Sequence, residues 1–168
     1  MHYILETERL RLRQLELTDA QFIVELVNTP GWLRFIGDRN IKTNEDAIRY
    51  LQNGPLKSYK ENGFGLLLVE LKSDQISIGT CGILKRDSLE NPDIGFAFLP
   101  EFTGKGYAFE VAHATLTYAK DELKLETIYA ITIPSNIKSI QLLKKMGLGF
   151  VKTIYDPKDN SELLLYSN

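Results

Sequence analysis

Hydrophobic and polar residues alternate at the start of the chain and then change to helical spacing. Leucines separate charged residues between Glu8 and Gln14, which predicts a strand with one buried face. Apolar residues then follow a period near four from Phe22 to Val27, which predicts a helix. We expect this helix to begin at a capping box, Thr18 to Gln21, and to end at Pro30-Gly31.

The next segment has no clean period, and residues 32–39 are predicted to form an irregular loop or a short helix. Thr43 to Asp46 has the composition of a helix start, so a second helix is expected there. Gly54-Pro55 should interrupt that helix, and a further helical piece should reach about Asn62.

Strands dominate the second half of the chain, with helical patterns placed between the later ones. The predicted strands are Leu66–Leu71, Ile76–Leu84, Asp93–Leu99, Thr127–Ile133, Gly149–Tyr155 and Leu163–Tyr166. One helix should follow a Gly-rich turn and carry six apolar residues on one face: Ala108, Val111, Ala112, Leu116, Ala119 and Leu123. The last helix should follow Asn136 and point Ile137, Ile140, Leu143 and Met146 inward.

This order of elements predicts one α/β (α+β) domain over residues 1–168. The three central strands are joined by short turns, so they should pair antiparallel, whereas the strand-helix-strand units that follow favour a parallel part. We therefore expect a mixed, mostly antiparallel sheet of six to seven strands, with helices on both faces.

Composition narrows the function classes. The chain has 168 residues, 43% of them hydrophobic and 25% charged, and a formal net charge of -2. Its basic residues are scattered, so a nucleic acid partner is not expected. No apolar run is long enough for a membrane span or a signal peptide, and the single cysteine, Cys81, is typical of a reducing compartment. We expect a cytoplasmic protein without a metal, since two histidines cannot form a His/Cys cluster.

The sharpest chemical signal is the turn Thr103-Gly104-Lys105-Gly106-Tyr107-Ala108, between a predicted strand and a predicted helix. The first turn of a helix has unpaired N–H groups, and glycines allow backbone to approach a phosphate closely. The turn therefore predicts diphosphate binding, although Gly-Lys-Gly is also a common surface turn. It is neither a P-loop, because Tyr107 follows Gly106, nor a dinucleotide fingerprint, because Phe109 stands at the third glycine position.

A second signal is Asn136-Ile137-Lys138-Ser139, directly after a predicted strand. Ser135 or Asn136 is expected to cap the following helix. An asparagine in that place can cap with one group and still present its amide to a ligand.

Together these segments resemble the GNAT superfamily of N-acetyltransferases. The resemblance rests on Gly104 to Ala108 with Glu110, on Pro134 to Ser139, and on Leu143 to Gly147. The opening Glu6 to Arg13 and the segment Phe35 to Arg39 are similar to the branch that acetylates ribosomal-protein N-termini.

The resemblance implies an acetyl-CoA site. The backbone amides of Gly104, Lys105, Gly106, Tyr107 and Ala108 would hold the diphosphate. The strand end at Phe98 and Leu99 would pair with the pantetheine arm and place an N–H at the thioester carbonyl. Asn136 and Ser139 would contact the cofactor from the other side.

Two positions depart from the family pattern. Thr103 stands where relatives carry a basic or amide side chain, and Leu143 stands where many carry the tyrosine that protonates the departing thiolate. The general acid is therefore unassigned, with Ser139 or a water as alternatives. Asp93 is a candidate general base, but a solvated turn residue after Asn91-Pro92 is the simpler interpretation.

The expected activity is acetyl transfer from acetyl-CoA to a primary amine, by direct attack in a ternary complex. The acceptor is left open: a protein N-terminus, a polyamine, an amino sugar or an amino acid. Trp32, Phe35 and Arg39 are expected near the acceptor pocket. A catalytically silent acyl-CoA-binding module and an interaction domain without cofactor are the alternatives, and a homodimer is expected from the resemblance.

Overall fold

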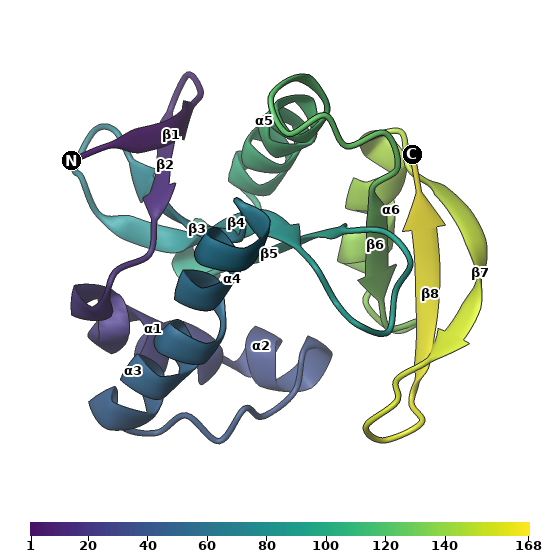
Figure 1. Cartoon of the computed structure of the whole chain (residues 1–168), viewed down its shortest axis with the longest axis horizontal. Helices are drawn as coiled ribbons and strands as arrows, with labels where there is room; N and C mark the ends of the chain where they lie inside the picture. Colours follow the sequence, from purple (N-terminus) through teal and green to yellow (C-terminus); the bar gives the residue numbers. More distant parts are fainter.

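The strands form one eight-stranded sheet with the order β1-β2-β3-β4-β5-β6-β8-β7, in a computed structural model that describes all 168 residues (Figure 1). The strands are β1 Tyr3–Glu6, β2 Leu10–Gln14, β3 Leu66–Leu71, β4 Ser77–Leu84, β5 Asp93–Phe98, β6 Tyr129–Thr132, β7 Gly149–Tyr155 and β8 Glu162–Ser167. Only β5 and β6 pair in parallel. The mixed, mostly antiparallel sheet is confirmed.

The sheet has one strand more than the six to seven expected, because β1 was not predicted. It pairs antiparallel with β2 through Leu5 and Leu12, but none of its own residues is fully buried. A short edge strand of this kind lacks the buried alternation that reveals strands in a sequence.

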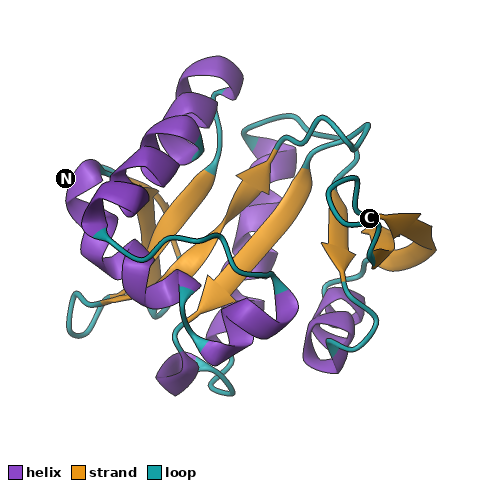
Figure 2. Cartoon of the chain, turned by 90° about the horizontal axis from the view of Figure 1, so that it is seen from below, coloured by secondary structure: helices purple, strands orange, loops and turns teal.

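Helices cover both faces of the sheet, as predicted (Figure 2). They are α1 Ala20–Val27, α2 Pro30–Phe35, α3 Asn44–Asn53, α4 Pro55–Asn62, α5 Tyr107–Asp121 and α6 Ile137–Lys145, with short 3-10 turns at η1 Leu17–Asp19 and η2 Pro100–Phe102. Strand β3 shows how the faces divide: Leu67 and Val69 pack with α5 and α6, whereas Leu68 packs with α1 and α3. This alternation follows from the two-residue period of a strand.

Three details of the helices differ from expectation. The capping box before α1 is formed by Glu16 and Asp19 around η1, so the predicted box from Thr18 to Gln21 was wrong. Pro30 begins α2 instead of only ending α1, because proline suits the first position of a helix. Ile137 is 58% exposed rather than inward, since it lies in the first turn of α6, outside the core. The helix start at Thr43 is confirmed by its capping box with Asp46.

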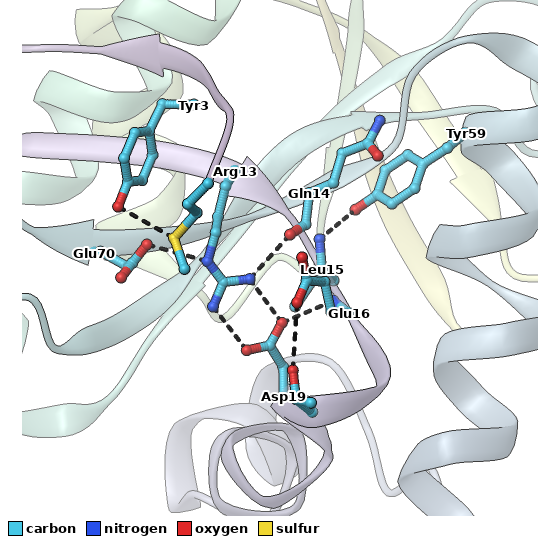
Figure 3. A network of polar contacts seen from close by, with 10 residues as sticks. Tyr3, Arg13, Gln14, Leu15, Glu16, Asp19, Tyr59 and Glu70 are labelled. Carbon is cyan, nitrogen blue, oxygen red and sulfur yellow. Dashed lines mark hydrogen bonds and ion pairs between the residues drawn. The ribbon is translucent and has the colours of Figure 1, made fainter.

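A buried ionic network joins the α1–α4 layer to the sheet (Figure 3). The Arg13 guanidinium on β2 donates to both carboxylate oxygens of Asp19, at 2.9 and 2.8 Å, and to Glu70 on β3 at 3.2 Å. Beside it, the Leu15 N–H donates to the hydroxyl of Tyr59 on α4, and burial raises the pKa of that tyrosine to about 12. Charged side chains are buried in this way almost only when paired.

None of the helices has both the length and the apolar character required to cross a membrane.

Candidate active site

The sheet opens into a fork between its two parallel strands, β5 and β6. The Tyr129 N–H donates to the Pro92 carbonyl at 2.8 Å, and Asp93 pairs with Tyr129, but no further residue of β5 pairs with β6. The two strands therefore diverge toward their carboxyl ends. Crevices at the carboxyl ends of parallel strands are common ligand sites in α/β proteins.

The backbone of β5 presents one free edge to this fork. The Leu99 N–H donates to the Ile78 carbonyl on β4 at 2.9 Å, on the side away from the fork. Because N–H groups alternate between the two edges of a strand, the N–H of Phe98 points into the fork. The sequence did not decide whether Phe98 or Leu99 donates its N–H to the thioester carbonyl. The structure excludes Leu99, because its N–H already has an acceptor.

The Gly-rich turn lies at the open end of the fork, between η2 and α5. Thr103 turns its hydroxyl back to the Pro100 carbonyl, at 2.7 Å. Gly104 and Gly106 have φ angles of 73° and 82°, in the left-handed region that glycine adopts without strain. Gly106 is the N-cap of α5, so the helix begins immediately after the second glycine.

This turn leaves a row of backbone donors without acceptors. The first N–H of the segment that bonds within the helix is that of Glu110, to the Gly106 carbonyl at 3.1 Å. The N–H groups from Gly104 to Phe109 donate to no other group of the chain. A Cβ at Gly104 would meet no atom within 4 Å, so the turn is also sterically open. Free amides at a helix N-terminus suit a diphosphate, both as donors and through the helix dipole.

Asn136 stands across the fork, at the start of α6 and after β6. Its Oδ1 accepts from the Ser139 N–H at 3.3 Å, which confirms it as the N-cap. Its Nδ2 donates to no other group of the chain. The structure therefore leaves one amide donor of Asn136 and the hydroxyl of Ser139 available on the β6 side of the fork.

Asn136→Asp and Asn136→Ala separate these two roles. Asp retains a capping oxygen, so its thermal stability should match the wild type, whereas Ala should lose about 1 kcal/mol. Both variants lose the Nδ2 donor, which the resemblance assigns to the cofactor, so on that assignment both should bind CoA more weakly. Thermal unfolding and a CoA titration measure the two effects, and unchanged CoA affinity in the Asp variant would remove Asn136 from the site.

Asp93 is not the solvated turn residue that the sequence favoured. It is 1% exposed at the closed end of the fork, and its two oxygens accept from Arg86 Nε at 2.9 and 3.1 Å. Burial raises the pKa of Asp93, although the Arg86 guanidinium acts in the opposite direction. A buried carboxyl whose pKa is perturbed both by desolvation and by a specific charged partner is a functional-site candidate.

Two other reactive side chains lie outside the fork. Cys81 is fully buried beside the Thr115 hydroxyl, and burial raises the pKa of its thiol to about 12, so Cys81 is a structural thiol. His113 is exposed on α5 beside the Phe109 ring. Leu143 is 1% exposed in the core and cannot protonate a thiolate.

Of the residues expected near the acceptor, only Trp32 enters the core. It packs in the same cluster as Leu99, and its buried Nε1–H has no acceptor. Phe35 is half-buried beneath the Arg34 guanidinium, and Arg39 is exposed. The three residues therefore do not form one pocket wall.

Sequence reasoning missed the two arginines that contact the site. Arg86 lies in a polar connection without periodicity, so nothing in the sequence pairs it with Asp93. Arg9 donates to Glu110 and to the Lys105 carbonyl. The sequence pointed to Arg9 only through the family resemblance of the segment Glu6 to Arg13, which gave this arginine no physical role.

Comparisons with known proteins identify the family of the chain. The acetyltransferase (GNAT) domain family matches residues 9–149. The chain is 31% identical over 157 residues to the uncharacterized N-acetyltransferase YnaD of Bacillus subtilis (strain 168), covering 92% of this chain and 88% of that protein. A GNAT-family acetyltransferase from Bacillus anthracis has a similar structure, with a TM-score of 0.80 and 26% identity, covering 99% and 98% of the two chains.

The fold is also shared with RimL, a ribosomal L7/L12 alpha-N-protein acetyltransferase solved in complex with coenzyme A. The TM-score is 0.85 at 13% identity, with 99% of this chain and 97% of the other covered. The chain thus belongs to the GNAT family of N-acetyltransferases, enzymes that take their acetyl group from acetyl-CoA.

Proposed function

We propose that this enzyme transfers the acetyl group of acetyl-CoA directly to a primary amine, in a ternary complex at the β5–β6 fork. The observation that carries the proposal is the row of free N–H groups from Gly104 to Phe109 at the open end of the fork. A diphosphate held there lets an extended arm continue along the free edge of β5. The arm then leads toward the buried carboxylate of Asp93.

The predicted cofactor contacts other than Leu99, whose N–H donates to Ile78, are compatible with this arrangement. The backbone N–H groups of Gly104, Lys105, Gly106, Tyr107 and Ala108 hold the diphosphate. The edge of β5 that includes Phe98 binds the pantetheine arm as an added strand would. Asn136 Nδ2 and the Ser139 hydroxyl close the site from β6.

Acetyl-CoA supplies an electrophilic thioester carbon. The amine nitrogen forms a bond to that carbon, the carbon–sulfur bond breaks, and CoA leaves as a thiolate that must gain a proton. The Phe98 N–H is a fixed donor for the negative charge on the carbonyl oxygen, which is where preset donors have their largest effect. No enzyme nucleophile takes part, in keeping with the buried thiol of Cys81.

The amine must lose a proton before it attacks. An α-amine has a pKa near 7.7–8.0 and a lysine amine near 10.4, so an α-amine needs less assistance. We propose Asp93, whose pKa is raised by burial, as the final proton acceptor through intervening waters, because five residues of extended strand, about 16 Å, separate it from Phe98. The Ser139 hydroxyl, or a water, returns a proton to the thiolate, since Leu143 cannot.

The acceptor is proposed to be a protein N-terminus or a small-molecule amine. A panel of N-terminal peptides, polyamines, amino sugars and amino acids, followed by thiol release from acetyl-CoA, tests this directly. Thiol release with at least one amine supports the proposal. Binding of acetyl-CoA without turnover on any amine would instead favour the catalytically silent module.

Asp93→Asn should lower kcat on the order of a hundredfold, the lower end of the range for general bases. In the wild type, activity should fall as the pH drops through the pKa of Asp93, because the protonated carboxyl accepts no proton. In Asp93→Asn this fall of activity at low pH should be absent. CoA affinity should not change, since Asp93 is at the closed end of the fork. Asp87→Asn, an exposed residue of the connection that precedes β5, is the matched control. An unchanged kcat in Asp93→Asn would limit Asp93 to anchoring Arg86.

A further inference from the structure

The segment between β1 and β2 reaches across to the first turn of α5. The Thr7 hydroxyl donates to Glu110 Oε1 at 2.6 Å, and the Arg9 backbone N–H donates to the same oxygen at 2.9 Å. Arg9 Nε donates to Glu110 Oε2 at 2.7 Å. Three donors from a segment a hundred residues away in sequence therefore hold one carboxylate at the Gly-rich turn. Partial burial disfavours the ionised form of Glu110, but these hydrogen bonds outweigh it and keep the pKa of the carboxyl below its usual range.

The other end of the Arg9 side chain contacts the turn itself. Nη1 donates to the Lys105 carbonyl at 3.0 Å, and the guanidinium lies 4.4 Å from the centre of the Tyr107 ring. A Cβ on Gly106 would be 3.3 Å from Nη2. Arg9 thus contacts Lys105 and Tyr107 and lies beside Gly106, and Glu110 fixes its orientation.

The contact with Lys105 determines where the next amide points. In a planar trans peptide the carbonyl and the following N–H point in opposite directions. Binding the Lys105 carbonyl to Arg9 therefore directs the Gly106 N–H away from Arg9. The positive guanidinium also offsets the Glu110 carboxylate, which would otherwise repel an anion at the turn.

We propose that Arg9, oriented by Glu110, is a positioning residue that sets the Gly-rich turn in the conformation that binds the diphosphate of acetyl-CoA. This inference rests on the proposed function of the turn. It assigns a physical role to Arg9, which takes no part in the pairing of β1 with β2.

The test compares two acetyl donors on the purified full chain. Acetyl-CoA carries the diphosphate, whereas S-acetylpantetheine has the same thioester and no diphosphate. Arg9→Ala should weaken CoA binding by about 10- to 100-fold, the size of a lost charged hydrogen bond, and raise KM for acetyl-CoA with little change in kcat. kcat/KM with S-acetylpantetheine should not change.

Two further variants distinguish a specific loss of CoA binding from a loss of folding. Arg34→Ala removes another arginine stacked on an aromatic ring and should bind CoA as the wild type does. Arg9→Lys keeps the charge and should recover part of the affinity. Equal losses with both donors, or CoA affinity within twofold of the wild type in Arg9→Ala, would overturn the inference. Failure of the wild type to bind CoA would instead overturn the proposed site.

Discussion

Gly106→Glu is expected to lower the affinity for acetyl-CoA roughly a thousandfold. A carboxylate placed in the turn would lie beside the diphosphate, and two like charges about 4 Å apart near a protein surface repel by about 4 kcal/mol. The new side chain would also meet Arg9 Nη2, 3.3 Å from its Cβ, and so disturb the clamp on Lys105. A titration of CoA against wild type and variant measures the loss.

The variant also strains the backbone, and Gly63→Glu controls for this. Gly63 ends α4 with a φ of 77° and ψ of 2°, close to the 82° and 0° of Gly106, and no atom lies near its Cβ position. Both variants should lose about 1–2 kcal/mol of stability. Only Gly106→Glu should lose CoA binding. Normal binding by Gly106→Glu would remove the turn from the site.

Arg13→Ala is expected to lower the free energy of unfolding by about 3–5 kcal/mol, because it leaves Asp19 and Glu70 charged and unpaired in the interior. Each of the three residues is at most 8% exposed. The network joins the sheet to the α1–α4 layer, which packs on Leu99 beside the fork. Urea unfolding followed by circular dichroism measures the loss.

The control replaces an arginine of an exposed pair. Arg49 pairs with Asp46 on the surface of α3, with 64% of its side chain exposed, so Arg49→Ala should cost less than about 1 kcal/mol. If the two arginine variants unfold at the same urea concentration, the buried network does not hold the helical layer.

Most of the fold was predictable because its strands and helices carry periodic patterns. Leu68 and Val69 occupy opposite faces, and the Thr43 cap precedes α3 as the sequence indicates. The edge strand β1 was missed because its side chains are only half-buried. The start of α2 at Pro30 was missed because the same residue is typical of a helix end and of a helix start.

The site was predictable only where backbone chemistry determines it. Two glycines before a helix require a particular turn, and the structure places both in the left-handed region. Side-chain partnerships between distant segments leave no pattern in a single sequence. The Arg86–Asp93 pair and the Arg9–Glu110 pair therefore emerged only from the structure, and Asp93 changed from a solvated residue to a buried one.

Thermal unfolding of the wild type and of Gly106→Glu, with acetyl-CoA, CoA or ATP, tests the central claim most directly. A ligand at about 100 times its dissociation constant adds roughly 2.7 kcal/mol to stability. We predict that acetyl-CoA and CoA stabilise the wild type, that ATP does not, and that Gly106→Glu responds to none of them. No stabilisation of the wild type at millimolar acetyl-CoA, or equal stabilisation of Gly106→Glu, would contradict a cofactor site at the Gly-rich turn.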